Sequence, residues 1–267
     1  MRRSIACIAA LVACQERVSE PGRGSAPPPP PAARAPASSA GPGQASPGPP
    51  SLPSAPPPLS SGPIRSRPVA SVPVAPDDPL RGKFTLAQAT AGLPSDGDLY
   101  AVMSTSLGKL VCELWPDKAP LTVANFVGLA RGLRPYKKDG KWLKKPLYDG
   151  TEFYSVIKNF ALEAGSPGAA FNAEIGYFIP DEIWDDARHD QRGLLCMRAF
   201  KPDRSGSQFM ILDGAAPQLD NSFTIFGKCG PSTVLDAISG APVENARPKP
   251  AIELRKLTIV RSKQPPS

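Results

Sequence analysis

Few side chains in this sequence are of the types that carry out nucleophilic, acid–base or metal chemistry. The 267 residues include one histidine and five cysteines. The histidine, His189, lies in the charged run 188–192 just before a predicted strand, and we interpret it as a structural loop residue rather than a general base. No cluster of His, Cys, Asp and Glu has the spacing of metal ligands, so the sequence predicts no metal site.

One stretch brings aromatic, hydroxyl and acidic side chains close together along the chain. It is residues 150–165, GTEFYSVIKNFALEAG. An apolar segment at 153–157 is followed by a polar turn at 158–159 and a second apolar run at 160–164. The pattern predicts two short strands joined by a turn. By itself the stretch indicates no reaction, and its meaning depends on the elements around it.

Residues 98–261 predict one domain that is long enough to bury a sizeable core. Period-2 alternation indicates several strands, and helical spacing follows Pro120 until Gly132. The alternation in the last strand changes phase near Arg255-Lys256, which predicts a β-bulge. Many short strands and two helices favour a closed antiparallel barrel, with a sandwich as the alternative. The predicted strands are 99–104, 110–115, 193–197, 208–212, 224–229 and 252–260, and the second helix is 233–239.

A lead-in of residues 81–97 precedes this domain, and residues 262–267 form a tail. Thr85 followed by Gln88 fits a capping box, in which each side chain bonds the other residue's backbone N–H. The lead-in is therefore expected to hold a short helix that stops near Gly92 and packs on the domain.

The N-terminus resembles an export signal. Two arginines precede a nine-residue apolar run, residues 5–13, which is far shorter than the roughly 20 residues that span a membrane. The run leads into Leu-Val-Ala-Cys, which resembles the bacterial lipobox, so we expect residues 1–13 to be a signal peptide and Cys14 to carry a lipid anchor. An ordinary signal peptide is the alternative. Gln15 favours the outer membrane, on the periplasmic side of the cell envelope.

Residues 14–80 predict a disordered tether. Positions 21–80 hold 20 of the 35 prolines, with much Ala, Ser and Gly. Such a segment cannot bury enough apolar surface to offset its chain entropy. Runs such as 27–31 favour an extended polyproline II spacer that lifts a domain off a membrane, and a docking motif is the alternative.

Basic residues outnumber acidic ones. Without the expected signal peptide, 29 basic side chains face 24 acidic ones. We interpret residues 131–145 as a solvated basic loop. The alternative is that this loop docks to anionic periplasmic partners such as lipopolysaccharide or acidic proteins. The predicted export argues against a nucleic-acid partner for this basic chain, and we expect the protein to be a monomer. The seven basic residues of this loop are Arg131, Arg134, Lys137, Lys138, Lys141, Lys144 and Lys145.

Three cysteines remain in the expected domain: Cys112, Cys196 and Cys229. An odd number does not indicate a disulfide framework. All three lie in apolar predicted strands, which favours buried free thiols over a disulfide. Adjacency of two of these strands would reverse that expectation.

Several separated blocks resemble the cyclophilin family of peptidyl-prolyl isomerases, in the family's order and over nearly all of residues 98–261. The resemblance implies an eight-stranded antiparallel barrel capped by two helices, in agreement with the predicted elements. It also implies action on X-Pro peptide bonds without a cofactor. The blocks are GKLVCEL at 108–114, KAPLTVANF at 118–126, YDGT at 148–151, RGLL at 192–195, GSQF at 206–209, LDNSF at 219–223 and FGK at 226–228.

The same resemblance aligns the family's catalytic arginine with a position in the stretch 150–165 described above. The family motif Phe-His-Arg-Val-Ile corresponds to FYSVI at 153–157, so Ser155 stands at the arginine position. A serine is short and neutral and cannot replace a guanidinium. Glu163 replaces a hydrogen-bonding Gln, and Arg198 replaces an Ala that faces the groove. Arg198 is therefore either a substitute donor or the ion-pair partner of Glu163.

Most of the remaining pocket positions are apolar in this sequence. Four of them, Phe160, Met210, Leu219 and Phe223, suffice to line a pocket for a proline ring. By resemblance Ala161 replaces a Met, Met210 a Phe, Gln218 a rim Trp and Phe223 a His, whereas Phe160 and Leu219 match the family.

These observations predict a weak peptidyl-prolyl cis-trans isomerase that acts on Pro-containing segments of exported proteins. A preorganised charged donor is worth a few kcal/mol to a transition state, so the loss at Ser155 should reduce turnover more than binding. The alternative is a catalytically inactive module that binds Pro-containing peptides or acts as a scaffold in the cell envelope.

Overall fold

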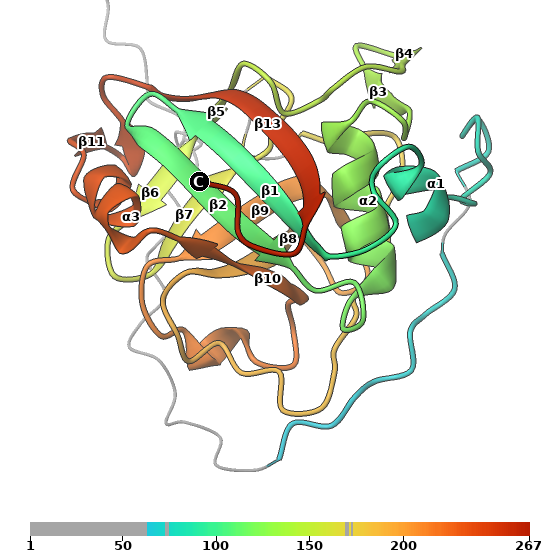
Figure 1. Cartoon of the computed structure of the whole chain (residues 1–267), viewed down its shortest axis with the longest axis horizontal. Helices are drawn as coiled ribbons and strands as arrows, with labels where there is room; N and C mark the ends of the chain where they lie inside the picture. The colour runs from blue at the N-terminus through green and yellow to red at the C-terminus, as the bar shows by residue number, and fades with distance from the viewer. Residues whose placement is uncertain (1–62, 73–74, 169–170, 172) are drawn as a thin grey trace, which may run out of the picture. The chain divides into compact units, whose positions relative to one another are not determined.

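The computed structural model describes residues 63–72, 75–168, 171 and 173–267. The predicted signal peptide, the expected lipidation site Cys14 and most of the predicted tether lie outside the described residues. Nine strands of the described part form one sheet (Figure 1). These strands are β1 (Asp98–Thr105), β2 (Gly108–Leu114), β5 (Thr151–Phe153), β6 (Ser155–Ile157), β7 (Ala161–Ala164), β8 (Leu194–Ala199), β9 (Ser205–Leu212), β10 (Ile225–Gly230) and β13 (Ile252–Ser262).

The sheet turns back on itself to form a nearly closed antiparallel barrel. Its strand order is β5-β13-β1-β2-β10-β8-β9-β7-β6. The two outermost strands, β5 and β6, are consecutive in the chain and are separated only by Tyr154. The Tyr154 N–H donates to the Glu163 carbonyl on β7 at 3.0 Å, while Phe153 pairs with Ile252 on β13. If β5 and β6 are taken as one bent strand, the barrel has the predicted eight strands. The single, nearly closed sheet excludes the alternative of a two-sheet sandwich.

Three α-helices accompany the barrel in the described residues: α1 (Leu86–Thr90), α2 (Pro120–Ala130) and α3 (Ser232–Ser239). The predicted capping box is present, because the Thr85 and Gln88 side chains each accept the other's backbone N–H. α2 is buried along almost its whole length because α1 packs against its outer side. Figure 1 shows α2 and α3 at opposite sides of the barrel.

Alternation along the strands separates two apolar clusters. Side chains that point into the barrel join the main core, where the rings of Phe126, Tyr148, Phe209 and Phe226 pack together. Side chains that point outward from the same strands form a second cluster. On β7, β8 and β9 the inward residues include Leu162, Ala164, Leu195, Met197, Phe209 and Ile211, and the outward residues include Ala161, Leu194, Cys196, Met210 and Leu212.

The predicted bulge in the last strand is confirmed. Ser104 pairs with Lys256 and Thr105 pairs with Leu254, so Arg255 is the extra residue on β13. An unpaired residue of this kind bends a strand and increases its twist, which helps a long strand to follow the curve of a barrel.

The expectation of free thiols is wrong for two of the three cysteines in the domain. β2 and β10 are neighbouring strands, and their register places Cys112 directly opposite Cys229. The two residues form a disulfide across 117 positions of sequence, while Cys196 stays a buried free thiol. Strand adjacency was the condition that would favour a bridge, and it depends on the fold rather than on local sequence.

Residues of the predicted basic loop fix both the lead-in and Asp78, near the end of the predicted tether, to the barrel. Arg134 and Asp78 form a buried bidentate ion pair, with N–O distances of 2.8 and 2.7 Å. The Arg134 guanidinium also lies 3.7 Å from the centre of the Tyr177 ring. Arg131 donates to the carbonyls of Ala89 and Ala91 at the end of α1. The loop is therefore only partly solvated.

The rest of the loop forms a small hairpin of β3 (Tyr136–Lys138) and β4 (Lys141–Leu143). Its Lys137 pairs with Asp77. Residues 63–72 and 75–80 also differ from the predicted tether. Ile64 is buried, for example, and the Arg67 N–H donates to the Ile183 carbonyl at 3.1 Å. No helix of the described residues is both long enough and apolar enough to cross a membrane.

We predict that Asp78→Ala lowers the free energy of unfolding by about 3–5 kcal/mol, because it leaves the buried Arg134 charge without its partner. Urea denaturation measures the loss. Asp77→Ala is the matched control, since Asp77 is exposed, and it should leave the midpoint nearly unchanged. An equal loss in both variants would contradict the assignment of stability to the buried pair.

The pair also predicts a pH dependence. Burial by itself raises the pKa of Asp78, but Arg134 and the backbone N–H groups of Leu80 and Gly82 outweigh burial and hold that pKa below its ordinary value. The contribution of Asp78 is therefore present above its unfolded pKa of about 4 and is lost as the pH falls through the lower folded value. Asp78→Ala should remove this part of the acid dependence.

We predict that reduction of the Cys112–Cys229 bridge lowers the free energy of unfolding by about 2–4 kcal/mol, because it frees a long loop in the unfolded chain. Unfolding is measured with and without reductant. The Cys112→Ala/Cys229→Ala variant should be insensitive to reductant. If the parent protein is insensitive as well, the bridge does not form.

Candidate functional site

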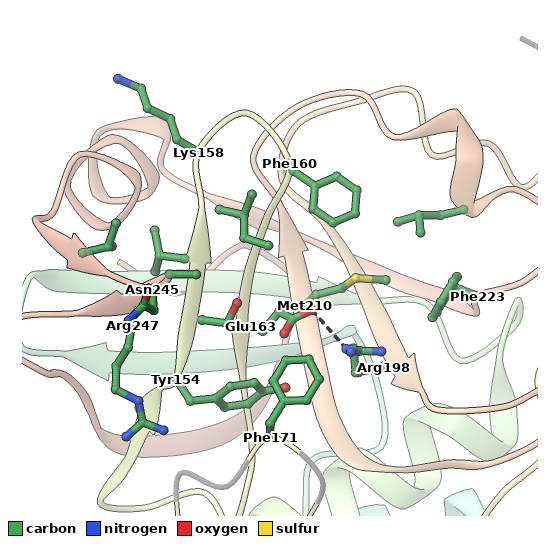
Figure 2. Close-up of a pocket in the computed structure, with 16 residues that line it drawn as sticks. Tyr154, Lys158, Phe160, Glu163, Phe171, Arg198, Met210, Phe223, Asn245 and Arg247 are labelled. Atoms are coloured by element: carbon green, nitrogen blue, oxygen red, sulfur yellow. Dashed lines mark ion pairs between the residues drawn. The ribbon is translucent and has the colours of Figure 1, made fainter. Parts of the chain in front are cut away.

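A groove of about 1080 Å³ lies on the outer face of the barrel (Figure 2). Its walls come from β6, β7, β8 and β9, from the segment that follows β9, and from a small hairpin of β11 (Val243–Glu244) and β12 (Arg247–Pro248). Among the site residues predicted from sequence, seven line the groove: Ser155, Phe160, Glu163, Arg198, Met210, Leu219 and Phe223.

Strand register explains why residues far apart in the sequence meet here. Ser155 on β6 pairs with Glu163 on β7, Glu163 pairs with Met210 on β9, and Met210 pairs with Cys196 on β8. Directly opposite residues of neighbouring strands point to the same face. These side chains therefore form one row across the outside of the barrel. Arg198 lies two residues beyond Cys196, so it points to the same face.

Glu163 and Arg198 form an ion pair inside the groove. The Arg198 Nε lies 3.0 Å from the Glu163 Oε1, with side chains that are 18% and 7% exposed. Figure 2 shows the pair beside Met210. The ion-pair alternative for Arg198 is therefore what the structure contains, and the guanidinium nevertheless remains at the groove wall. Its Nη1 also donates to the Ala199 carbonyl at 3.2 Å.

The Glu163 carboxyl group is held in a largely dry environment. Burial raises its pKa, while the Arg198 charge and a hydrogen bond from Ser155 oppose that rise without cancelling it. The Ser155 hydroxyl is thus used to bind the residue opposite it. The second carboxyl oxygen, Oε2, is buried and has no hydrogen-bond partner within the described part of the chain.

Aromatic rings surround the Arg198 guanidinium. Its carbon atom lies 5.0 Å from the centre of the Phe171 ring and 5.3 Å from that of Phe200. The Tyr154 ring meets Phe171 edge to face at 5.9 Å between centres, and Figure 2 shows the two rings next to each other. The Tyr154 hydroxyl is buried and makes no hydrogen bond of normal geometry to the described residues. Burial, assisted by the Glu163 charge, raises its pKa.

Two predicted site residues do not line the groove. Ala161 is fully buried in the outer cluster and does not reach the groove walls. Gln218 lies in the 3-10 helix η1 (Pro217–Leu219) and is exposed, outside the groove walls. Position in the family motif was the only basis for both predictions.

Other wall residues were not predicted as site residues. They are Tyr154, Val156, Ile157, Lys158, Phe171, Val243, Asn245, Ala246 and Arg247. The hairpin reaches the groove because the Val156 N–H donates to the Ala246 carbonyl at 2.7 Å. The φ angles of Asn245 and Ala246 are +51° and +64°. Asn readily adopts this left-handed conformation, so Asn245 is the local signal of the turn, but its contact with β6 depends on the fold.

His189 lies outside the groove walls. Its ring Nδ1 is 3.0 Å from the Asp220 Oδ1, and its backbone N–H donates to the same oxygen. Burial lowers the pKa of His189, although Asp220 opposes that effect. The residue therefore joins a buried loop to Asp220. The described residues contain no group of three or more His, Cys, Asp or Glu side chains that could hold a metal ion.

Comparison with known families matches residues 100–259 to the model described as "Cyclophilin type peptidyl-prolyl cis-trans isomerase/CLD". The peptidyl-prolyl cis-trans isomerase A of Mycobacterium tuberculosis is 34% identical over 165 residues, which cover 60% of this chain and 91% of that protein. The peptidyl-prolyl cis-trans isomerase B of Streptomyces anulatus is 34% identical over 157 residues, which cover 57% and 90% of the two chains.

Solved structures agree with these matches. A cyclophilin type peptidyl-prolyl cis-trans isomerase of Cryptosporidium parvum superposes with a TM-score of 0.53 and 27% identity, over 63% of this chain and 99% of that chain. A second structure of that protein, determined in the presence of the dipeptide Ala-Pro, gives a TM-score of 0.52 at 27% identity, over 62% and 99% of the two chains.

We predict that the Glu163 carboxyl group titrates above the ordinary glutamate pKa of about 4.3, as followed by carbon NMR of the side chain. Arg198→Ala should raise this pKa further, because the guanidinium charge stabilises the carboxylate. Arg204→Ala is the matched control, since Arg204 lies outside the groove walls and packs on Phe178. A Glu163 pKa that Arg198→Ala leaves unchanged would contradict the ion pair.

The sign of the effect on stability follows from the raised pKa. Glu163 contributes stability that is fully present below its unfolded pKa and is lost as the pH rises through its folded pKa. Glu163→Gln should therefore remove this decline between acidic and neutral pH, as measured by urea denaturation across that range.

Proposed function

The chain belongs to the family of cyclophilin-type peptidyl-prolyl cis-trans isomerases, and from that premise we propose that its groove binds X-Pro segments and isomerises them slowly, with Arg198 as the donor. The observation that carries this proposal is the position of the Arg198 guanidinium. It lies at the groove wall beside Met210, on the same face of the barrel as Ser155.

The reaction requires no covalent chemistry. Rotation about an X-Pro bond faces a barrier of about 20 kcal/mol, because resonance joins the carbonyl group to the prolyl nitrogen. A catalyst must bind the twisted bond more tightly than either planar isomer. A fixed hydrogen-bond donor near the prolyl group can do this, because twisting localises the nitrogen lone pair and an N–H can donate to it.

Arg198 has the chemistry of such a donor. A guanidinium carries five N–H groups, and the contacts with Glu163 and the Ala199 carbonyl leave further donors for a ligand. Glu163 restricts the side chain to the groove wall, and the Phe171 and Phe200 rings flank it. The arginine of the family motif is absent at Ser155, and Arg198 brings a guanidinium to the same face from β8.

The apolar part of the groove suits a proline ring. Phe160, Met210, Leu219 and Phe223 all line it, and all four pack in or against the outer apolar cluster. The structure of the Cryptosporidium parvum relative in the presence of Ala-Pro supports an X-Pro ligand for this groove too. Burial of the ring against these side chains would supply most of the binding energy.

A second candidate function is peptide binding without turnover. Two observations favour it. The Ser155 hydroxyl is bonded to Glu163 rather than free to act on a ligand, and the Arg198 charge is partly neutralised by its pair. Such a domain would act as a Pro-peptide-binding module or scaffold.

We also propose that the domain works on exported proteins, as a monomer in the cell envelope, anchored through Cys14 with the outer membrane favoured. The signal-like N-terminus and its lipobox support this. The Cys112–Cys229 bridge supports it independently, because disulfides persist in oxidising compartments such as the periplasm. The exposed lysines of the β3–β4 hairpin would face anionic partners there.

Exchange NMR on an acetylated, amidated Ala-Ala-Pro-Ala peptide tests the proposal. We predict measurable acceleration of cis–trans exchange by the parent protein and an acceleration that is lower by about tenfold or more for Arg198→Ala. Ser155→Arg, which restores the family arginine, should increase exchange by at least about tenfold. Arg204→Ala, outside the groove walls, should match the parent.

The outcomes separate the two candidates. Binding of the peptide with exchange no faster than that of the peptide alone would reject the isomerase and support the binding module. Exchange that Arg198→Ala leaves unchanged would reject Arg198 as the donor. Absence of both binding and exchange would reject both functions.

A further inference from the structure

The chain carries X-Pro bonds of its own immediately before the described domain. Residues 49–62, PPSLPSAPPPLSSG, contain six prolines and no charged residue. We propose that this segment docks into the groove of its own domain and competes with external Pro-containing peptides. The inference rests on the proposed X-Pro binding function of the groove.

The point where this segment joins the domain is fixed by several contacts. Ile64 is buried, and its carbonyl accepts from the Asp186 N–H at 3.0 Å. The Ser66 N–H donates to the Asp185 carboxylate at 2.6 Å. The Arg67 N–H donates to the Ile183 carbonyl, and the Arg67 guanidinium pairs with Asp181 at 3.2 Å. Residues 64–67 are therefore attached along residues 181–186.

One apolar cluster connects this attachment to the groove. Ala187 belongs to the outer apolar cluster, and Trp184 packs against it. The same cluster contains Met210 and Leu219, which line the groove, and Phe223 also packs against it. Segment 49–62 consequently starts from a site that shares one packed cluster with the groove.

The chain is long enough to reach the groove. Pro53 lies eleven residues before Ile64, and a fully extended chain of that length spans at most roughly 36–40 Å. A domain of this size has a radius of gyration of roughly 16 Å. The extended reach of Leu52-Pro53 is therefore similar to the diameter of the domain, about 40 Å for that radius of gyration, which is enough for a groove that shares one apolar cluster with the attachment.

The chemistry of the segment also fits the groove. Its X-Pro pairs Leu52-Pro53 and Ala55-Pro56 carry small or apolar side chains, which suits walls built from Phe and Met. Its backbone supplies both carbonyl acceptors and N–H donors. The Glu163 Oε2 and the Tyr154 hydroxyl, two buried polar atoms that line the groove without a good partner in the described chain, could bond to that backbone.

A tethered ligand competes strongly even when its intrinsic affinity is low. Short flexible connections give effective concentrations in the millimolar range, so a weak internal X-Pro site is occupied much of the time. An external peptide then binds only to the unoccupied fraction, and its apparent affinity falls by that fraction. The segment would in this way reserve the groove for clients that present several prolines or a high local concentration.

The experiment compares full-length chains. In the first variant Pro49, Pro50, Pro53, Pro56, Pro57 and Pro58 are all replaced by Ala. In the matched control six prolines farther from the domain, Pro27 to Pro31 and Pro36, are replaced by Ala. Binding of the acetylated, amidated Ala-Ala-Pro-Ala peptide is titrated by amide NMR shifts of groove residues. The first variant should bind the peptide about fivefold more tightly than the parent, and the control should match the parent.

Each outcome has a distinct meaning. Tighter binding by the first variant alone, at two protein concentrations that differ tenfold, supports docking within one chain. A gain that grows with protein concentration overturns it, because the segment then acts between copies. Equal binding by all three proteins overturns the docking but leaves the groove function intact. Absence of peptide binding in all three overturns the proposed function and this inference together.

Discussion

The closure of the barrel at Tyr154 is the constraint on which the rest of the domain depends. One strand must break there so that β5 can pair with β13 while β6 pairs with β7. The break fixes the phase of the alternation on both sides, so that Phe153 enters the core and Ser155 faces the groove. A shift of one residue would exchange these faces and would place a serine in the core. The groove and the core are therefore two results of one register.

The Glu163–Arg198 pair follows from the same register. A carboxylate that is almost fully buried on an apolar face is strongly unfavourable without a partner. Arg198 reaches Glu163 from β8, across the intervening β9. Without Glu163, the Arg198 guanidinium would lie among aromatic rings with one fewer counter-charge. Without Arg198, the Glu163 carboxylate would tend to take up a proton. The two substitutions thus depend on each other physically, whichever function the groove has.

Local patterns in the sequence predicted the local features well. The Thr85–Gln88 capping box and the bulge at Arg255 each depend on residues within a few positions, and the structure contains both. Features that depend on strand adjacency could not be predicted in this way. The Cys112–Cys229 bridge needs β2 beside β10, and the β11–β12 wall needs Ala246 beside Val156. The family pattern located most of the groove, whereas Ala161 and Gln218 do not line its walls.

The separation of two apolar clusters explains how the fold can persist while the polar groups of the site change. The aromatic core around Phe126 and Phe209, the disulfide and the buried Asp78–Arg134 pair all lie away from the groove walls. Exchanging an arginine for Ser155, or an alanine for Arg198, alters side chains on the outer face and leaves the inner packing untouched. The core and the strand order that place this chain in its family therefore do not depend on the few outward residues of the groove, and it is on those residues that the proposed isomerisation would depend.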